Sequence, residues 1–105
     1  IICRNVCFIT EVVMTGKSDA KCDGTAYSWH CARDRYANAG GVDAGVIVLI
    51  HGLGLTRAMW DGQITALNQN HDILAYDLAG HGESDRLAGV ADLSLFVDQL
   101  CQLLD

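Results

Sequence analysis

The chain has 105 residues, of which 50% are hydrophobic and 19% charged, and its formal net charge is −6 at pH 7. This composition excludes a disordered or low-complexity chain and fits one domain with one modest hydrophobic core. Thirteen acidic residues against seven basic ones also argue against sequence-independent binding of nucleic acid, which requires basic surface to neutralise phosphates.

Residues 1–13 are expected to precede the folded domain, which we assign to residues 14–105. Ile1 is not an initiator residue, whereas Met14 is followed by a polar stretch. The apolar N-terminal stretch has no basic leader and no small-residue cleavage site, and no apolar run of the chain reaches the roughly 20 residues that span a bilayer. We therefore expect a cytoplasmic protein with no membrane partner and no nucleic-acid partner.

The five cysteines, at positions 3, 7, 22, 31 and 101, are odd in number and form no C-x-x-C pair. This pattern argues against a disulfide framework and against a zinc site. Free thiols are expected, and no metal or other cofactor is implied.

The first part of the chain predicts a short β-hairpin. Residues 11–15 and 25–31 are expected to form strands, with turns at residues 16–19 and at Asp23-Gly24. The Asp-Gly dipeptide is among the strongest signals for a two-residue hairpin turn. Residues 32–45 predict a loop.

From residue 45 onward the pattern becomes that of an α/β protein. Residues 46–50 and 73–76 are apolar without alternation, as in strands buried on both faces of a parallel sheet. Thr56 is expected to cap a helix that runs to about residue 69. The order strand, helix, strand, helix predicts a parallel pair with a right-handed crossover.

A second amphipathic helix is predicted after Asp92, whose side chain can cap it. Gln99 lies away from the apolar stripe of this helix. The stripe consists of Leu93, Phe96, Val97, Leu100, Leu103 and Leu104.

The two glycine-rich loops that follow the predicted parallel strands do not fit nucleotide binding. A dinucleotide fingerprint requires G-x-G-x-x-G, but Arg57 and Asp85 occupy the third glycine positions of the two loops. Gly16-Lys17-Ser18 matches the end of a P-loop, but Glu11 occupies the position of its first glycine. A nucleotide-binding α/β domain is therefore the weakest of three hypotheses.

The same loops suit acyl transfer, in which backbone N–H groups beside glycines stabilise a developing oxyanion. His51-Gly52-Leu53-Gly54 forms H-G-x-G after the first parallel strand, and residues 77–84 form D-x-x-G-x-G-x-S after the second. With both motifs in this order and at this separation, the chain resembles the α/β-hydrolase superfamily over residues 42–105. The resemblance implies an α/β fold with a partial hydrolase sheet: an N-terminal hairpin plus two parallel strands with two crossover helices.

The resemblance associates the first motif with the oxyanion hole and the substrate. Leu53 matches the position whose backbone N–H forms one half of the oxyanion hole and whose side chain faces the substrate. Gly52 and Gly54 would shape this turn, and His51 would hold the loop by hydrogen bonds to the backbone rather than carry a proton.

The resemblance gives the second motif a role in loop structure. Asp77 and Ser84 match positions that fix the loop through side chain-to-backbone hydrogen bonds, and Gly80 and Gly82 belong to the same loop. Ser84 is not expected to be a nucleophile, because Arg86 replaces the second glycine of a G-x-S-x-G elbow.

The family's catalytic triad is not expected in this chain. The nucleophile of such enzymes follows a later strand, and the acid and the histidine come after it. We therefore expect an N-terminal fragment of an α/β-hydrolase, inactive alone, whose parent hydrolyses a small ester, lactone or related substrate. A non-catalytic binding or interaction module derived from the same fold is the alternative. In either case residues 46–50 would form an unpaired sheet edge, so self-association of the chain is expected.

Overall fold

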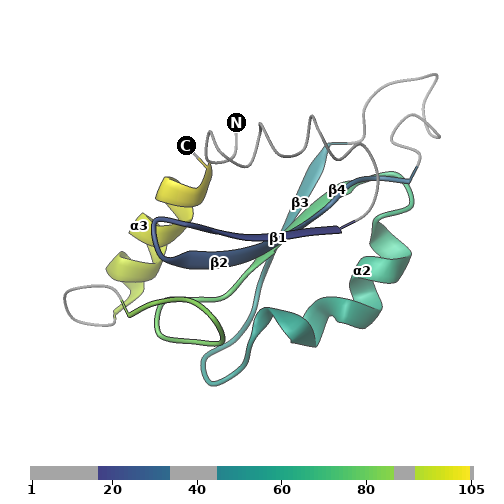
Figure 1. Ribbon diagram of the computed structural model, residues 1–105. Helices are drawn as coiled ribbons and strands as arrows, with labels where there is room; N and C mark the ends of the chain where they lie inside the picture. The colour runs from purple at the N-terminus through teal and green to yellow at the C-terminus, as the bar shows by residue number, and fades with distance from the viewer. Residues whose placement is uncertain (1–16, 34–44, 87–91, 105) are drawn as a thin grey trace.

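The computed structural model describes residues 17–33, 45–86 and 92–104 (Figure 1). In chain order the elements are β1 (Lys17–Cys22), β2 (Thr25–His30), β3 (Val46–Ile50), the 3-10 helix η2 (Arg57–Trp60), α2 (Asp61–Leu67), β4 (Asp72–Tyr76) and α3 (Leu93–Leu104).

The strands form a four-stranded mixed sheet with the order β1-β2-β4-β3 and with helices on its two faces. The β1/β2 and β2/β4 pairs are antiparallel, and the β3/β4 pair is parallel. The partial α/β sheet predicted from the sequence is therefore confirmed.

The hairpin has its turn at the predicted Asp23-Gly24 dipeptide, but its first strand includes residues that were predicted to form another turn. Asp23 and Gly24 both have positive φ, 50° and 82°, as a type I′ turn requires. The two-residue turn fixes the register, so pairing runs back to Lys17 opposite His30. The turn predicted at residues 16–19 is therefore wrong over Lys17 to Asp19, which lie in β1. The strand predicted at residues 11–15 and the leader at residues 1–13 lie outside the described residues.

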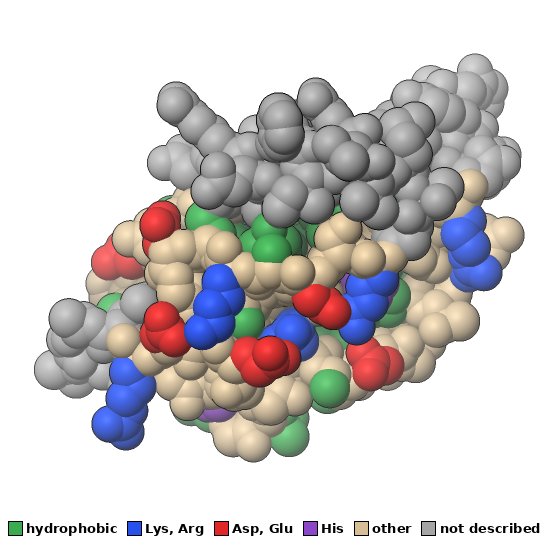
Figure 2. Space-filling model, viewed as in Figure 1, with side chains coloured by type: hydrophobic (Ala, Val, Ile, Leu, Met, Phe, Trp, Pro, Cys, Tyr) green, Lys and Arg blue, Asp and Glu red, His purple; other side chains and the backbone are tan. Residues whose placement is uncertain are grey.

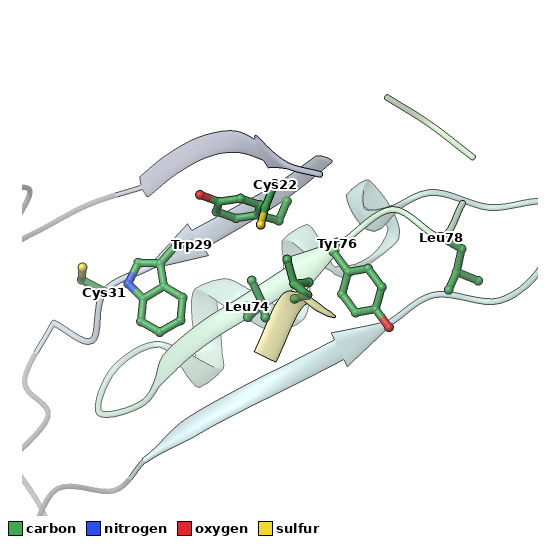
Figure 3. Close-up of a cluster of buried hydrophobic side chains, with 8 residues drawn as sticks. Cys22, Trp29, Cys31, Leu74, Tyr76 and Leu78 are labelled. Atoms are coloured by element: carbon green, nitrogen blue, oxygen red, sulfur yellow. The ribbon is translucent and has the colours of Figure 1, made fainter. Parts of the chain in front are cut away.

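β4 is the buried centre of the sheet, and its alternating residues serve the two faces. Ile73 and Ala75 pack toward α2, whereas Leu74 and Tyr76 pack into the cluster that contacts α3 (Figure 3). The prediction of a strand buried on both faces is confirmed here. The larger cluster consists of Cys22, Tyr27, Trp29, Cys31, Leu74, Tyr76, Leu78 and Leu103.

β3 has the predicted range but not the predicted burial. Its ends are open, with Val46 42% and Ile50 45% exposed. The reason is its position in the sheet, because within the described residues β3 pairs with β4 alone and ends the strand order. The sequence of an interior strand thus lies at a sheet edge.

The helix predicted from Thr56 is present but divided and shorter. Its first turn is the 3-10 helix η2, and α2 then ends at Leu67. The Thr56 side chain makes no capping hydrogen bond, so this part of the prediction is wrong. Ile64 is the buried contact of α2 with the sheet.

α3 begins with the predicted cap, and it packs only part of the predicted stripe (Phe96, Leu100 and Leu103) against the core. Asp92 Oδ1 accepts a hydrogen bond from the Leu95 N–H at 3.1 Å. Leu103 is buried, whereas Leu93 is 78% exposed and Val97 49%. Gln99, expected on the polar side, is 1% exposed, because its amide meets the polar backbone of the loop that follows β4.

Cys22 is disulfide-bonded, which corrects the expectation of free thiols for that residue. Cys31 and Cys101 are free, and Cys31 is buried against the larger cluster. No helix in the described ranges combines the length and the apolar character needed to cross a bilayer.

Candidate functional site

The two sequence motifs meet at one edge of the sheet. β3 and β4 are parallel neighbours, so the loops that leave their carboxyl ends start side by side. The first loop carries His51 to Gly54, and the second runs from Asp77 to Ser84. All eight residues singled out from the sequence therefore lie on two adjacent loops.

The first loop closes in a tight turn around Leu53. The Leu55 N–H donates to the Gly52 carbonyl at 3.1 Å, and Gly54 has a φ of +82° at the third position of the turn. Positive φ at that position is the signature of a type II turn, which explains Gly54. Leu53 is 74% exposed, and no described residue accepts a hydrogen bond from its N–H. The turn thus contains a backbone donor that no described group uses.

His51 links the first loop to the second. Its ring is 3% exposed, and its Nε2 accepts a hydrogen bond from the Leu78 N–H at 3.0 Å. Its Nδ1 lies 2.7 Å from the Gly52 carbonyl oxygen, so Nδ1 carries the proton. Both ring nitrogens are therefore committed to backbone groups in the neutral form.

His81 links the second loop back to the first, and it was not singled out from the sequence. Its Nε2 accepts a hydrogen bond from the Gly54 N–H at 3.0 Å, and its Nδ1 lies 3.1 Å from the Ala79 carbonyl oxygen. The centroids of the His51 and His81 rings are 5.2 Å apart. The position of His81 between two glycines of the second motif was the available signal, but its partner is 27 residues away in the sequence.

Asp77 fixes the start of the second loop as a buried anion. Its carboxylate accepts the Arg57 N–H at 2.7 Å and the Glu83 N–H at 3.0 Å, and it pairs with the Arg57 guanidinium. Burial alone would raise the pKa of Asp77, but these two backbone donors and the guanidinium outweigh it and lower the pKa below its usual range. The charged carboxylate therefore holds η2 and both ends of its own loop.

Gly82 and Ser84 close this loop against Asp77 and the hairpin. Gly82 has a φ of +49°, and a Cβ there would lie 2.8 Å from Asp77 Oδ1 and nearer still to Oδ2. The Ser84 hydroxyl donates to the Asp77 carbonyl at 2.6 Å and accepts the Ala26 N–H at 2.8 Å. Its hydrogen-bonding capacity is thus engaged in joining the loop to β2.

Gln99 is the second structural residue that sequence reasoning missed. Its Oε1 accepts the Ala79 N–H at 2.9 Å, and its Nε2 donates to the Asp77 carbonyl and to Thr25 Oγ1 at 3.0 and 3.1 Å. A single buried amide therefore ties α3 to the second loop and to β2. Buried amides with every partner present specify one arrangement strongly.

A polar cavity of about 400 Å³ lies between the hairpin and the segment η2–α2. Figure 2 shows acidic and basic side chains interspersed over the face on which β1 lies. Several of the lining groups bind one another, as Lys17 pairs with Asp19 at 3.6 Å and Arg57 donates to Ser28 Oγ at 2.8 Å. Burial and then Lys17 lower the pKa of His30, which also lines the cavity. Residues from the hairpin and from α2 that line it include Lys17, Asp19, Ser28, His30, Asp61 and Ile64.

The sequence model of the alpha/beta hydrolase family matches residues 47–105, which is more than half of the chain. The chain belongs to the alpha/beta hydrolase family. The resemblance inferred from the two motifs is therefore confirmed, and the matched region contains both loops.

Individual relatives of this alpha/beta hydrolase chain are hydrolases of small molecules by name. An (E)-2-((N-methylformamido)methylene)succinate hydrolase of Acinetobacter baylyi is 40% identical over 52 residues, covering 50% of this chain and 20% of the relative. The 3-oxoadipate enol-lactonase 1 of the same species is 40% identical over 43 residues, covering 41% of this chain and 16% of the relative.

A solved structure extends the likeness to most of this alpha/beta hydrolase chain. The enol-lactonase of Burkholderia xenovorans LB400 superposes with a TM-score of 0.58 at 26% identity, covering 84% of this chain and 32% of the enol-lactonase. The chain thus spans a fifth or less of those two curated relatives and about a third of the solved structure.

Proposed function

We propose that this chain is the N-terminal part of an alpha/beta hydrolase domain and contributes one half of an oxyanion hole. The observation that carries the proposal is the turn at Leu53, an exposed residue after a parallel strand whose backbone N–H has no described acceptor. Donors fixed in this way stabilise the negative charge that develops on a carbonyl oxygen during acyl transfer.

In this proposal the nucleophile, the histidine and the acid of the triad are supplied from outside residues 1–105. Ser84, the serine nearest to a nucleophile motif, is 9% exposed and bonded to the Asp77 carbonyl and the Ala26 N–H. His51 and His81 hold backbone donors at Nε2, so neither is free to take a proton from a serine. These contacts support structural roles for all three residues.

The proposed substrate class is a small ester, lactone or related compound. Support comes from the enol-lactonases among the relatives, by sequence and by structure. The cytoplasmic location expected from the sequence stays a prediction. A non-catalytic binding module built on the same fold is the alternative, and specific binding of a ligand by the 105-residue chain without turnover in any assembled form would favour it.

The isolated chain is expected to hydrolyse p-nitrophenyl acetate no faster than buffer does. Covalent catalysis and general-base catalysis each contribute orders of magnitude, and the proposal assigns neither to this chain. The measurement is the rate of p-nitrophenolate release, with Ser84→Ala as the matched variant. Turnover by the chain that disappears in Ser84→Ala would contradict the proposal and make Ser84 the nucleophile.

We propose that the isolated chain self-associates through β3. Within the described residues this strand has hydrogen-bonded neighbours on one side only, and Val46 and Ile50 are partly exposed. An uncharged strand at a sheet edge is a template for pairing with a second copy. The −6 charge opposes association, but salt screens it beyond about 8 Å at physiological ionic strength.

Val46→Lys is expected to shift the chain from oligomer to monomer in sedimentation velocity experiments. Lysine at an edge strand disfavours pairing, and Val46 is exposed, whereas Val48 packs against the larger cluster and is a poorer site for a charge. Leu93→Lys is the control, since it adds the same charge at an exposed apolar residue of α3, away from the sheet edge. A monodisperse wild-type monomer with a cooperative melt at micromolar concentration would contradict self-association.

A further inference from the structure

We infer that His81 is a positioning residue for the proposed oxyanion turn, which it holds through a ring nitrogen that accepts a hydrogen bond. The inference deepens the proposed function and rests on it for the role of the turn. It concerns a residue on the second loop that controls the backbone of the first. The contact that carries it is the hydrogen bond from the Gly54 N–H to His81 Nε2 at 3.0 Å.

Gly54 is the point at which the turn can be held or released. It follows Leu53 directly, so the orientation of the Leu53–Gly54 peptide decides the shape of the turn. Gly54 has a φ of +82°, and a Cβ there would meet nothing within 4 Å, so neighbouring side chains do not brace this glycine by packing. The bond to His81 is therefore the specific restraint that the second loop provides.

His81 is itself held in the tautomer that this role requires. Its Nδ1–H donates to the Ala79 carbonyl at 3.1 Å, which leaves the lone pair of Nε2 for the Gly54 N–H. Phe96 of α3 packs edge-on against the ring, with centroids 6.5 Å apart. The ring is thus fixed by its own loop and by a helix, and it acts on the other loop.

The test measures hydrogen exchange of the Gly54 amide in the 105-residue chain, residue by residue, as protection relative to the intrinsic exchange rate. At pH 7.5 the wild type should protect Gly54 about tenfold more than His81→Ala, the effect of one hydrogen bond. Amides of β4 serve as internal reference, since they should stay equally protected in both proteins if the fold is intact.

His81→Gln separates positioning from general loop stability. Glutamine extends far enough to offer an acceptor near the position of Nε2, so Gly54 should keep most of its protection in this variant. His71→Gln, which changes a histidine bonded to Asn70 on the segment before β4, should leave the protection of Gly54 at its wild-type value.

Two results would overturn the inference: equal Gly54 protection in wild type and His81→Ala at pH 7.5, or a loss of Gly54 protection in His81→Gln as large as in His81→Ala. The experiment measures hydrogen exchange at Gly54 and not catalysis, so the inference about His81 is tested separately from the catalytic proposal. Loss of the oxyanion function of Leu53 would leave the exchange result standing.

Discussion

Leu53→Pro is expected to lower kcat by about 100- to 1000-fold in an active enzyme that carries this turn, the cost of removing one oxyanion-hole donor. Proline removes the backbone N–H of residue 53 and also replaces the side chain that is proposed to face the substrate. It also suits the second position of a type II turn, the position that Leu53 occupies before Gly54 with its φ of +82°. The substitution therefore deletes the donor while the turn is kept.

The measurement requires an active enzyme, because the chain is proposed to lack a nucleophile. Residues 17–105 would replace the corresponding third of the Burkholderia xenovorans enol-lactonase, to which 84% of the chain superposes. Hydrolysis of a lactone and of p-nitrophenyl acetate would be compared for the chimera and its Leu53 variants. An unchanged melting temperature would establish that the proline variant is folded.

Leu53→Ala is the matched control, since it shortens the side chain and keeps the N–H. We expect it to change KM more than kcat, because the exposed side chain is proposed to face the substrate. If Leu53→Pro retained kcat within a few-fold of the parent chimera, the turn would not donate to the oxyanion. If both variants lost kcat equally, the side chain and not the N–H would be the important group.

Gly82→Ala is expected to destabilise the chain by about 3 kcal/mol or more, against about 1–2 kcal/mol for Gly80→Ala. Both glycines have positive φ in the same loop, 49° and 75°, so an L side chain is strained at either position. They differ in their surroundings. A Cβ at Gly80 would make an ordinary contact of 3.6 Å with Arg86 Cγ, whereas a Cβ at Gly82 would overlap the Asp77 carboxylate.

The overlap is costly because Asp77 cannot move without breaking its bonds to the Arg57 and Glu83 backbone and to the Arg57 guanidinium. Removing a buried charge from its partners costs several kcal/mol. Denaturation in urea, followed by fluorescence of Trp29 and Trp60, gives the free energies of unfolding of the two variants.

A double-mutant cycle identifies the cause. In an Asp77→Ala background the overlap is absent, so Gly82→Ala should cost little more there than Gly80→Ala does. Equal losses for the two glycine variants in the parent chain would show that backbone strain alone sets the cost. Strictly additive effects of Asp77→Ala and Gly82→Ala would lead to the same conclusion.

Local sequence was sufficient where neighbouring residues carry the whole signal. The Asp23-Gly24 turn follows from the positive φ that both positions adopt, and the apolar run of β4 follows from burial on two faces. The two loop motifs identified the family because each motif is a short continuous segment, so its glycines, and Asp77 in the second, can be recognised from local spacing alone. The cap at Asp92 likewise needs only the first turn of α3.

The tertiary structure decided the features whose partners are distant in the chain. β1 lies at the edge of the described sheet and carries charged residues. Lys17 to Asp19 were predicted to form a turn, and they form a strand because they pair with β2. β3 has an interior composition, but its exposure depends on how many strands lie beside it. Burial at an edge is a property of the sheet and not of the residues in the strand.

The site divides in the same way. The sequence alone determined that two glycine-rich loops, which carry Leu53 and Asp77, follow two parallel strands. Only the fold decided that His81 reaches Gly54 across 27 residues and that Gln99 on α3 binds the loop backbone at Ala79. A buried hydrogen bond between distant residues depends on both partners being brought within about 3 Å, and no local pattern encodes that distance.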